Sequence, residues 1–397
     1  MPSSIAVVGL GYIGLPLALA AANSGYRVTG IDIDQFKIDQ INKGISPIED
    51  VSDAQLIQTL KNLNFISSSD FQLIQKCEVI VICVPTPLTK NRKPDLSFVQ
   101  NAIKFISPNL KEGSLIILES TVAPGTTRNL LPDLIEKYSK FSISDLYLAY
   151  SSERVDPLNK NWNLRNTPKI VAGLDSISRE KARVFYTRFV DKVIEAESLE
   201  SAELAKLLEN SFRLINISFI NEFSMYCLEK GINVKEVISL ASSKPYGFMP
   251  FYPSIGVGGH CIPVDPLYLV DSAREIGVPT RFLDLANQIN LEMPGYFVSQ
   301  AVAILKDLIG KKILVVGVSY KPNVADVRES PVEALMASLK QKSAHVFWHD
   351  DLVKEWNGEK SVALSSNFDL AIIATPHDYL DLTKLGNVPI LNTRGSI

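Results

Sequence analysis

Gly9-Leu10-Gly11-Tyr12-Ile13-Gly14 is the stretch that decides the fold of the first part of this chain. It follows directly on the short apolar run 5–8. The alanine- and leucine-rich segment 15–22 comes next and is typical of a helix, with Pro16 in the first turn, where a missing N–H costs nothing. The next predicted strand, residues 26–32, ends in Asp32. This order of strand, glycine motif, helix, strand and acid is the pattern that binds a dinucleotide.

The glycine motif therefore predicts an NAD site. Amides at the start of the helix would hold the pyrophosphate, and Asp32 would accept hydrogen bonds from the ribose hydroxyls. An acid at this position favours NAD over NADP, because a 2′-phosphate would meet a negative charge. A glycine turn in an unrelated α/β protein is the alternative interpretation. The predicted cofactor residues in this part of the chain are Gly9, Gly11, Tyr12, Ile13, Gly14, Asp32 and Lys37.

Further short apolar runs continue the pattern at residues 79–84, 115–118, 147–150 and 169–172. Separated by helical stretches, they predict a doubly wound parallel sheet. Two of the runs end in polar loops, Pro85-Thr86-Pro87 and Glu119-Ser120-Thr121. Because ligands of open parallel sheets bind at the carboxyl ends of the strands, these loops should border the cofactor.

From Ser198 the composition changes to one long helical run that ends near Lys230-Gly231. Apolar residues recur in it at spacings of three and four, and further apolar residues between them predict burial on more than one side. Lys206 and Asn210 stand one turn apart on this helix and point the same way. A lysine in an apolar segment is costly unless it is paired or used, although a lysine that reaches solvent from a domain boundary is the alternative. The residues of the predicted apolar face are Leu204, Leu208, Phe212, Ile215, Phe219 and Phe223.

The stretch Gly256-Val257-Gly258-Gly259-His260-Cys261-Ile262-Pro263-Val264-Asp265 carries the most reactive side chain. Three glycines in four positions allow the backbone to approach a ligand closely, and the prolines stiffen the exit from the loop. A thiol followed four residues later by a carboxylate suits a covalent catalytic site. A surface turn with an incidental buried cysteine fits the same residues, since cysteine is among the most buried residue types.

A second α/β pattern follows a helical stretch at 279–308, with predicted strands at 313–318, 344–348, 370–374 and 389–391. This part has no GxGxxG motif, so we do not expect a second dinucleotide to be held by that device. Lys321 and Arg328 lie in the loop after its first strand and could hold phosphate and cofactor groups. A solvated basic loop is equally consistent with these two residues.

Composition excludes several classes of function. The 397 residues are too many for one core and predict two or three domains. A formal net charge of -3 gives no electrostatic basis for binding nucleic acid or an anionic membrane. No apolar run reaches membrane-spanning length, and no signal peptide precedes the first strand. Scattered cysteines and histidines show no metal-ligand spacing, so we expect a cytoplasmic protein without a metal.

Together these motifs resemble those of the UDP-glucose/GDP-mannose dehydrogenase family of nucleotide-sugar dehydrogenases, and the resemblance extends over essentially the whole chain. Several independent motifs in the right order make it more specific than any one motif. They are residues 9–14, 84–87 and 120–126, Lys206 with Asn210, residues 258–261 with Asp265, and residues 321–323 with 326–330.

The resemblance implies an α/β fold of two Rossmann-like, doubly wound parallel-sheet domains joined by a long central helix. Residues 1–197 would bind NAD, and residues 198–300 would form a central helical dimerisation domain with the cysteine loop. Residues 301–397 would bind the UDP-sugar. The implied assembly is a homodimer through the central helix. The implied reaction is a four-electron oxidation of the sugar C6 alcohol to a carboxylate, with two NAD used in succession.

The resemblance also assigns roles to single residues. Cys261 would capture the aldehyde as a thiohemiacetal, whose oxidation gives a thioester that water cuts. Lys206 would stabilise the developing oxyanion and favour the thiolate. Asn210 and Asp265 would position water and orient Lys206, Glu153 would serve hydrolysis, and Thr121 would lie near the nicotinamide. Further cofactor contacts would be Pro85, Thr86, Thr121 and Arg328, and the substrate contacts Glu153, Arg154, Lys206, Asn210, Phe251, Tyr252, Gly258, Gly259 and Lys321.

Finer motifs resemble the enzymes that oxidise UDP-N-acetylglucosamine. They are residues 84–90, 94–97, 152–157 and 244–253. UDP-glucose enzymes typically show a Phe-Leu pair after the glutamate and a serine before the nucleophile, where this chain has Arg154 and His260. The chain departs from the subgroup at Ser152, Leu158 and Ser254-Ile255. We therefore expect a UDP-N-acetylhexosamine 6-dehydrogenase that supplies a uronic acid for surface polysaccharide. UDP-N-acetylglucosamine is the favoured substrate, with UDP-N-acetylmannosamine and UDP-glucose as alternatives.

Two other classes compete with this expectation. A β-hydroxyacid or 6-phosphogluconate-type dehydrogenase also pairs a Rossmann domain with a helical lysine and asparagine, but it has no use for Cys261 or a second α/β domain. A non-catalytic sensor of sugar nucleotides or NAD would keep the glycines and Asp32. Such a sensor need not retain Cys261, Lys206 and Asp265 together.

Overall fold

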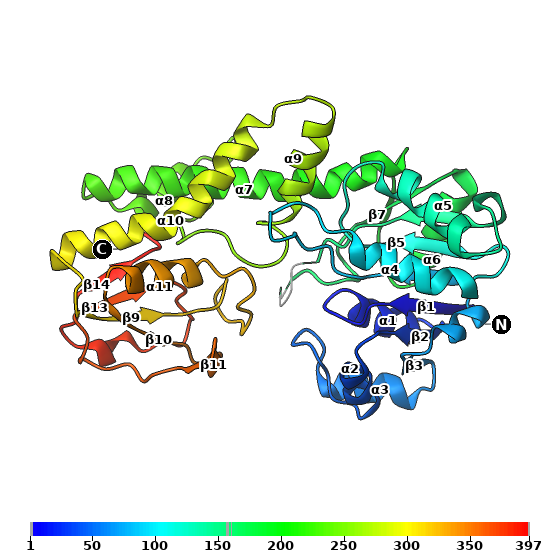
Figure 1. The fold of residues 1–397 in the computed structure, drawn as a ribbon, viewed down its shortest axis with the longest axis horizontal. Helices are drawn as coiled ribbons and strands as arrows, with labels where there is room; N and C mark the ends of the chain where they lie inside the picture. The colour runs from blue at the N-terminus through cyan, green and yellow to red at the C-terminus, as the bar shows by residue number, and fades with distance from the viewer. Residues whose placement is uncertain (1–2, 156–158, 160, 396–397) are drawn as a thin grey trace. The chain divides into compact units, whose positions relative to one another are not determined.

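The computed structural model describes residues 3–155, 159 and 161–395, and these residues form two compact units (Figure 1). The first unit contains the chain as far as Leu208 together with Leu267–Ser272, and the second contains Glu209–Pro266 and the chain from Ala273 onward. Among the described residues, no helix is long and apolar enough to cross a membrane.

The first unit is built on an eight-stranded sheet with the order β3-β2-β1-β4-β5-β6-β7-β8. The first six strands in chain order thus have the arrangement 3-2-1-4-5-6 of a dinucleotide-binding fold, which reverses direction between β1 and β4. The strands are β1 (Ser4–Val8), β2 (Arg27–Ile31), β3 (Phe65–Ser68), β4 (Val79–Ile82), β5 (Leu115–Leu118), β6 (Tyr147–Tyr150), β7 (Lys169–Gly173) and β8 (Val193–Glu195).

Helices cover both faces of this sheet, because successive side chains of a buried strand point to opposite sides. Ile5 and Val7 of β1 pack in one apolar cluster with α1, α2, α3 and α6, whereas Ala6 and Val8 pack in another with α4 and α5. The helices are α1 (Gly14–Asn23), α2 (Gln35–Asn42), α3 (Asp53–Lys61), α4 (Ser97–Ile106), α5 (Thr126–Tyr138) and α6 (Ser176–Tyr186). Short 3-10 helices are η1 (Phe71–Lys76), η2 (Ser107–Asn109) and η3 (Ile143–Asp145).

One strand runs against the predicted direction. The apolar runs predict an all-parallel sheet, but β7 pairs antiparallel with β6, through Ala149 opposite Gly173 and Tyr150 opposite Ala172. The described residues between these strands contain no helix, and a strand that returns without a crossover helix pairs antiparallel. As a consequence, the first residue of β7, Lys169, lies at the edge of the sheet where β6 ends.

The helix α7 (Leu199–Glu229) confirms the predicted long helical run, and it is drawn in green in Figure 1. Its predicted apolar face is exposed rather than buried, since Leu208 and Phe219 are 64% and 62% exposed. The further apolar residues Leu207, Leu214 and Ile220 are buried, as predicted for another side of the helix. Several polar residues are buried with them and are hydrogen-bonded. The Ser218 hydroxyl donates to the Ala286 carbonyl at 2.7 Å, and the Asn221 side chain accepts from the Ser254 N–H at 2.8 Å. The prediction of burial on that face was therefore wrong, since periodicity locates an apolar face but not what covers it.

The second unit carries a four-stranded parallel sheet with the order β10-β9-β13-β14 and a two-stranded hairpin of β11 and β12. Apolar residues of α10 and α11 cover one face of the larger sheet, and η4 with the preceding loop covers the other. The elements are α8 (Val234–Ser242), α10 (Arg281–Leu305), β9 (Lys312–Val316), α11 (Val332–Gln341), β10 (His345–His349), β11 (Glu355–Trp356), β12 (Glu359–Lys360), β13 (Leu370–Ile373), the 3-10 helix η4 (Leu382–Leu385) and β14 (Ile390–Asn392). The helix α9 (Asp265–Glu275) begins and ends in the second unit, and its middle, Leu267–Ser272, belongs to the first.

Candidate active site

The three glycines of the first motif each have a distinct place between β1 and α1. Gly9 has φ +93°, and a Cβ there would lie 2.7 Å from the Cys83 carbonyl oxygen, so strands β1 and β4 meet closely at this point. A Cβ on Gly14 would overlap the Gly9 carbonyl oxygen. A Cβ on Gly11, in contrast, would meet no atom of the protein within 4 Å. This open backbone beside the start of α1 fits a pyrophosphate, which needs close approach to loop amides.

Asp32 follows β2 and is almost completely buried. Its Oδ2 accepts from the Leu10 N–H and from Lys37 Nζ, both at 2.8 Å, and its Oδ1 accepts from the Asp34 N–H at 3.0 Å. The acid thus fixes the glycine loop. Lys37 offsets part of its negative charge, which weakens the discrimination against a 2′-phosphate that the acid alone would give.

The loops after β4 and β5 are joined, as expected for loops that border one ligand. The Ser120 hydroxyl donates to the Val84 carbonyl at 2.6 Å. In the loop after β4, Thr86 is buried and Pro85 is exposed. Thr121 continues from Ser120 and is half-buried. A residue that the sequence analysis missed, Glu203 of α7, accepts from the Gly125 N–H at 2.6 Å and the Thr127 N–H at 2.9 Å. It ties the Thr121 loop to the helix that carries Lys206.

Glu153 lies just after β6 and is held by its own loop and by a buried lysine. Its Oε1 accepts from the N–H groups of Arg154 at 2.7 Å and Val155 at 2.6 Å, and its Oε2 lies 3.5 Å from Lys169 Nζ. Burial alone would raise the pKa of Glu153, but Lys169, the two N–H groups and Lys206 together hold that pKa below its usual range. Glu153 is therefore ionised and electrostatically coupled to Lys206 within the same unit.

Arg154 does not extend into solvent. Its guanidinium donates to the Pro168 carbonyl at 2.8 Å, so it braces the segment that leads into β7. Asp156, Pro157 and Leu158, which belong to the same motif and its departure from the subgroup, lie outside the described residues.

In the second unit, the cysteine loop packs against the segment after β9. The Gly259 N–H donates to the Arg328 carbonyl at 3.0 Å, and a Cβ on Gly258 would lie 2.7 Å from the Glu329 carbonyl oxygen. Gly259 has φ +81° and faces the ring of Tyr320. The glycines therefore allow the loop to pack closely against the rest of the protein, in addition to any close approach to a ligand. Burial is the main cause that lowers the pKa of His260, with Arg328 adding to it, so this residue is neutral at pH 7.

Cys261 is exposed, whereas Cys77, Cys83 and Cys227 are buried. The alternative of an incidental buried cysteine is therefore wrong for this position. The Asp265 N–H donates to the Cys261 carbonyl at 2.8 Å, which places Cys261 in the turn directly before α9. The start of a helix favours negative charge, as on a thiolate.

Asn210 and Asp265 meet as a buried pair beside this turn. The Asn210 amide donates to Asp265 Oδ2 at 2.6 Å, and both side chains are at most 4% exposed. The bond fixes the start of α9, and thus the turn that carries Cys261, to α7.

Replacing Asn210 by alanine is expected to lower the free energy of unfolding by about 1–3 kcal/mol, because a buried carboxylate oxygen loses this donor. Chemical denaturation followed by circular dichroism measures the change. Asn216→Ala is the matched control on the same helix, since the Asn216 amide donates only to the Phe212 carbonyl one turn back. Equal stability of the two variants would contradict the structural importance of the pair.

The carboxyl ends of β9 and β13 form the switch point of the second sheet. Asp350, at the end of β10, accepts from the Val318 N–H at 2.9 Å and from the Ser319 hydroxyl at 3.1 Å. His377 Nε2 lies 3.0 Å from the same carboxylate, while His377 Nδ1 accepts from the Asn323 N–H at 2.8 Å. Burial would raise the pKa of Asp350, but His377 and backbone N–H groups hold that pKa well below its usual range.

This network orders the segment that carries Lys321 at the switch point. The structure places Lys321 there, two residues before Asn323. Arg328 is half-exposed, and its guanidinium pairs with Asp326 at 2.5 Å. Phe251 packs against Phe212 of α7 with ring centroids 5.8 Å apart, whereas Tyr252 is exposed.

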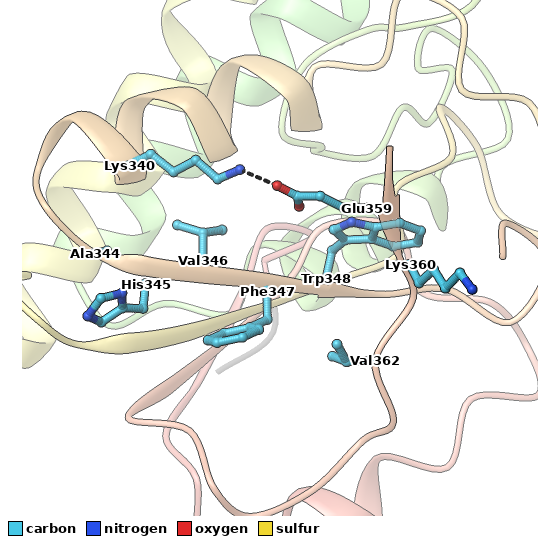
Figure 2. A pocket seen from close by; sticks show the side chains of 9 residues that line it. All are labelled: Lys340, Ala344, His345, Val346, Phe347, Trp348, Glu359, Lys360 and Val362. Atoms are coloured by element: carbon cyan, nitrogen blue, oxygen red, sulfur yellow. Dashed lines mark hydrogen bonds and ion pairs between the residues drawn. The ribbon is translucent and has the colours of Figure 1, made fainter. Parts of the chain in front are cut away.

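The second unit also has a hollow of about 540 Å³ along the edge strand β10 (Figure 2). Lys340 and Glu359 form an ion pair of 2.9 Å across its rim. None of the predicted site residues lines this hollow, so it is separate from the candidate site. The residues that line it are Lys340, Ala344, His345, Val346, Phe347, Trp348, Glu359, Lys360 and Val362.

The predicted residues thus form two groups, one on each compact unit. The first unit brings together the glycine motif, Asp32, Thr86, Thr121, Glu153 and Lys206, and the second brings together Asn210, the cysteine loop, Asp265, Lys321 and Arg328. Among the residues that the structure describes, no cluster of three or more His, Cys, Asp or Glu side chains is placed to hold a metal ion.

A dinucleotide-binding unit followed by a second Rossmann-like unit with an exposed thiol defines an α/β oxidoreductase. Comparison with known proteins identifies the family. Residues 3–190 match the NAD binding domain, residues 200–292 the central domain and residues 314–393 the UDP binding domain of the UDP-glucose/GDP-mannose dehydrogenase family.

Individual relatives cover nearly the whole chain. UDP-N-acetyl-D-mannosamine dehydrogenase of Methanococcus maripaludis is 35% identical over 395 residues, which are 97% of this chain and 88% of that protein. The Escherichia coli K12 protein of the same name is 34% identical over 372 residues, 89% of this chain and 86% of that protein. The solved structure of UDP-D-ManNAc dehydrogenase from Pyrococcus horikoshii has a TM-score of 0.91 at 32% identity, covering 99% of this chain and 96% of that chain.

The chain therefore belongs to the UDP-glucose/GDP-mannose dehydrogenase family. It is an NAD-dependent nucleotide-sugar dehydrogenase, an oxidoreductase, which confirms the resemblance, the fold class and the cofactor predicted from the sequence.

Proposed function

We propose that this protein oxidises the C6 alcohol of a UDP-N-acetylhexosamine to the uronate, in two steps that share Cys261. The observation that carries the proposal is the exposure of Cys261 in the turn directly before α9, whose first residue belongs to the buried Asn210–Asp265 pair. A thiol held at a helix start by packed glycines suits a nucleophile.

In the first oxidation, C6 loses a hydride and its hydroxyl loses a proton, which Lys206 or a water that it controls accepts. The Cys261 thiolate then forms a C–S bond with the aldehyde carbon, and the aldehyde oxygen takes a proton to give a thiohemiacetal. Loss of a second hydride and the hydroxyl proton from this adduct leaves a thioester. Attack by water on the thioester carbon breaks the C–S bond, releases the uronate and restores the thiol. NAD, when bound at the Gly9–Gly14 loop, supplies the hydride acceptor for both oxidations.

The surrounding residues support these steps by charge and position. Lys206 stabilises the negative oxygen of the tetrahedral species, and the ionised Glu153 polarises the attacking water. Asp265, Asn210 and Thr121 orient the water and the reacting carbon. Lys321 holds the diphosphate and Arg328 the cofactor, while Phe251 and Tyr252 border the sugar.

The relatives favour one sugar over another. Those at 34–36% identity are named for UDP-N-acetyl-D-mannosamine, and one at 33% is named for an NDP-N-acetyl-D-galactosaminuronic acid. These names support UDP-N-acetylmannosamine as the first candidate. UDP-N-acetylglucosamine, its C2 epimer, is the second candidate, because the motifs at 84–90 and 244–253 resemble enzymes that use it.

An assay of NADH release across UDP-N-acetylmannosamine, UDP-N-acetylglucosamine, UDP-N-acetylgalactosamine, UDP-glucose and GDP-mannose tests the proposal. The expected result is the highest kcat/KM for a UDP-N-acetylhexosamine, with two NADH formed for each sugar consumed. A ratio of one NADH per sugar would contradict the thioester route. Ligand-induced thermal stabilisation without turnover of any sugar would favour the sensor instead.

We also propose that two copies associate through α7, as the exposed apolar residues Leu208, Phe212 and Phe219 support. Light scattering with size-exclusion chromatography measures the mass in solution. A monomer at micromolar concentration would contradict the proposed dimer.

A further inference from the structure

We propose that Lys169 is a positioning residue for thioester hydrolysis: its ammonium group keeps the Glu153 carboxylate ionised and in place, while Glu119 and Tyr186 anchor the ammonium. This inference rests on the proposed function, in which Glu153 acts on the hydrolytic water.

Lys169 is the only lysine in its strand, and its side chain is 4% exposed. Its Nζ donates to Glu119 Oε2 at 2.8 Å, to the Ser152 carbonyl at 3.5 Å and to Glu153 Oε2 at 3.5 Å. The three N–H groups of the ammonium are therefore matched by three acceptors. The short hydrogen bond to Glu119 fixes the position of the ammonium group. At the longer distance to Glu153, the attraction between the two charges contributes more than a directional hydrogen bond does.

The fold brings these residues together from four elements. Glu119 directly follows β5, and Ser152 and Glu153 follow β6. Lys169 begins β7, which reaches the same edge of the sheet because it runs antiparallel to β6. From the end of α6, the Tyr186 hydroxyl donates to Glu119 Oε1 at 2.5 Å. Both oxygens of Glu119 thus accept a hydrogen bond, one from Tyr186 and one from Lys169. Glu119 thereby fixes the Lys169 ammonium group in a position from which it also reaches Glu153.

The charges in this cluster are unequal, with two carboxylates beside one buried ammonium. Burial raises the pKa of Glu119 to about 7 despite the adjacent Lys169, whereas the pKa of Glu153 is held below its usual range. As the pH falls, Glu119 is therefore the first of the two carboxylates to take up a proton, and Glu153 stays ionised. Within the part of the chain that the structure describes, the titratable groups that interact electrostatically with Glu153 are Lys169 from β7, Glu119 after β5, Lys206 from α7 and Cys83 after β4, and Tyr186 from α6 interacts with Glu119.

Two substitutions are expected to differ in their effect on the pH profile. Lys169→Met removes the cation that favours the ionised form of Glu153, so the acidic limb of kcat should move up by about one pH unit or more. Glu119→Gln replaces a carboxyl group that is already protonated at the pH of this limb, so it should leave the limb in place. A merely structural role for Lys169 would change stability and leave the limb in place.

The experiment measures kcat for NADH release between about pH 3.5 and 9, so that the acidic limb of the unmodified protein lies inside the range, with UDP-N-acetylmannosamine and UDP-N-acetylglucosamine as substrates. Lys181→Met is the matched control, because Lys181 lies exposed on α6 with its Nζ 4.3 Å from the Tyr147 ring centroid. Its profile should coincide with that of the unmodified protein.

Lys169→Met leaves Glu119 buried without its cation and could prevent folding. The double variant Glu119→Gln/Lys169→Met removes both charges of the buried pair, which proteins tolerate better. Its acidic limb should lie at higher pH than that of Glu119→Gln alone, and this difference isolates the effect of Lys169. Coincident limbs for these two variants, or an unshifted limb for a folded Lys169→Met, would overturn the inference while the proposed function stands. An unmodified protein that releases no NADH would overturn the proposed function, and the inference with it.

Discussion

Replacing Cys261 by alanine is expected to reduce uronate formation at least about 1,000-fold, because the proposed mechanism needs this thiol to hold the aldehyde for the second oxidation. Of the four cysteines, only Cys261 is exposed. NADH should fall from two to at most one per sugar consumed. Mass spectrometry of the uronate, together with NADH absorbance, measures both quantities.

Cys227→Ala is the matched control for this loss. Cys227 is buried in a small apolar cluster with Ile220, Val234 and Ile238, away from the glycine loop in sequence. Removal of its sulfur should lower stability by about 1 kcal/mol and leave the ratio of two NADH per sugar. Undiminished uronate formation by Cys261→Ala would remove this residue from the mechanism.

The second large effect is expected at the first glycine motif. Gly11→Ala should raise the dissociation constant for NAD about 10- to 100-fold, equivalent to about 1.4–2.8 kcal/mol, because a methyl group would occupy the approach to the loop amides. The free energy of unfolding should hardly change, since the added Cβ meets nothing within 4 Å and Gly11 is not among the glycines with positive φ. Calorimetric titration with NAD and thermal unfolding separate the two quantities.

Gly14→Ala provides the contrasting variant three residues away. Its Cβ would overlap the Gly9 carbonyl oxygen and press on the Cys83 side chain, so α1 would have to move away from β1 and β4. Such overpacking should cost about 3 kcal/mol of stability. Unchanged NAD affinity in Gly11→Ala would show that the open backbone at Gly11 does not face the cofactor.

Local pattern was sufficient for much of the fold. The GxGxxG motif with Asp32 predicted β1, α1 and β2, and the apolar runs predicted the central strands, because hydrophobic periodicity and glycine requirements act over a few residues. The long helix α7 followed from the same kind of signal. The order of several motifs identified the family, which the comparison with known proteins confirmed.

Some features were beyond the reach of pattern. The antiparallel direction of β7 was missed, because an apolar run has no direction. Glu119, Lys169 and Tyr186 were missed as a cluster because they are 17 to 67 positions apart in pairs. The one feature of the sequence that could have indicated this cluster was a lysine as the first residue of an apolar strand. The exposure of the apolar face of α7 also required the packed chain.

By itself, the sequence determined the dinucleotide-binding start and the family, and it singled out Cys261 as the candidate nucleophile, since these inferences depend on residue types at short, fixed spacings. Only the tertiary structure decided that Cys261 is exposed, that Asn210 is bonded to Asp265, and that Lys169 faces Glu153. The physical reason is that burial and charge coupling act through space. They therefore depend on which distant segments the chain brings into contact, and residue spacing does not record that.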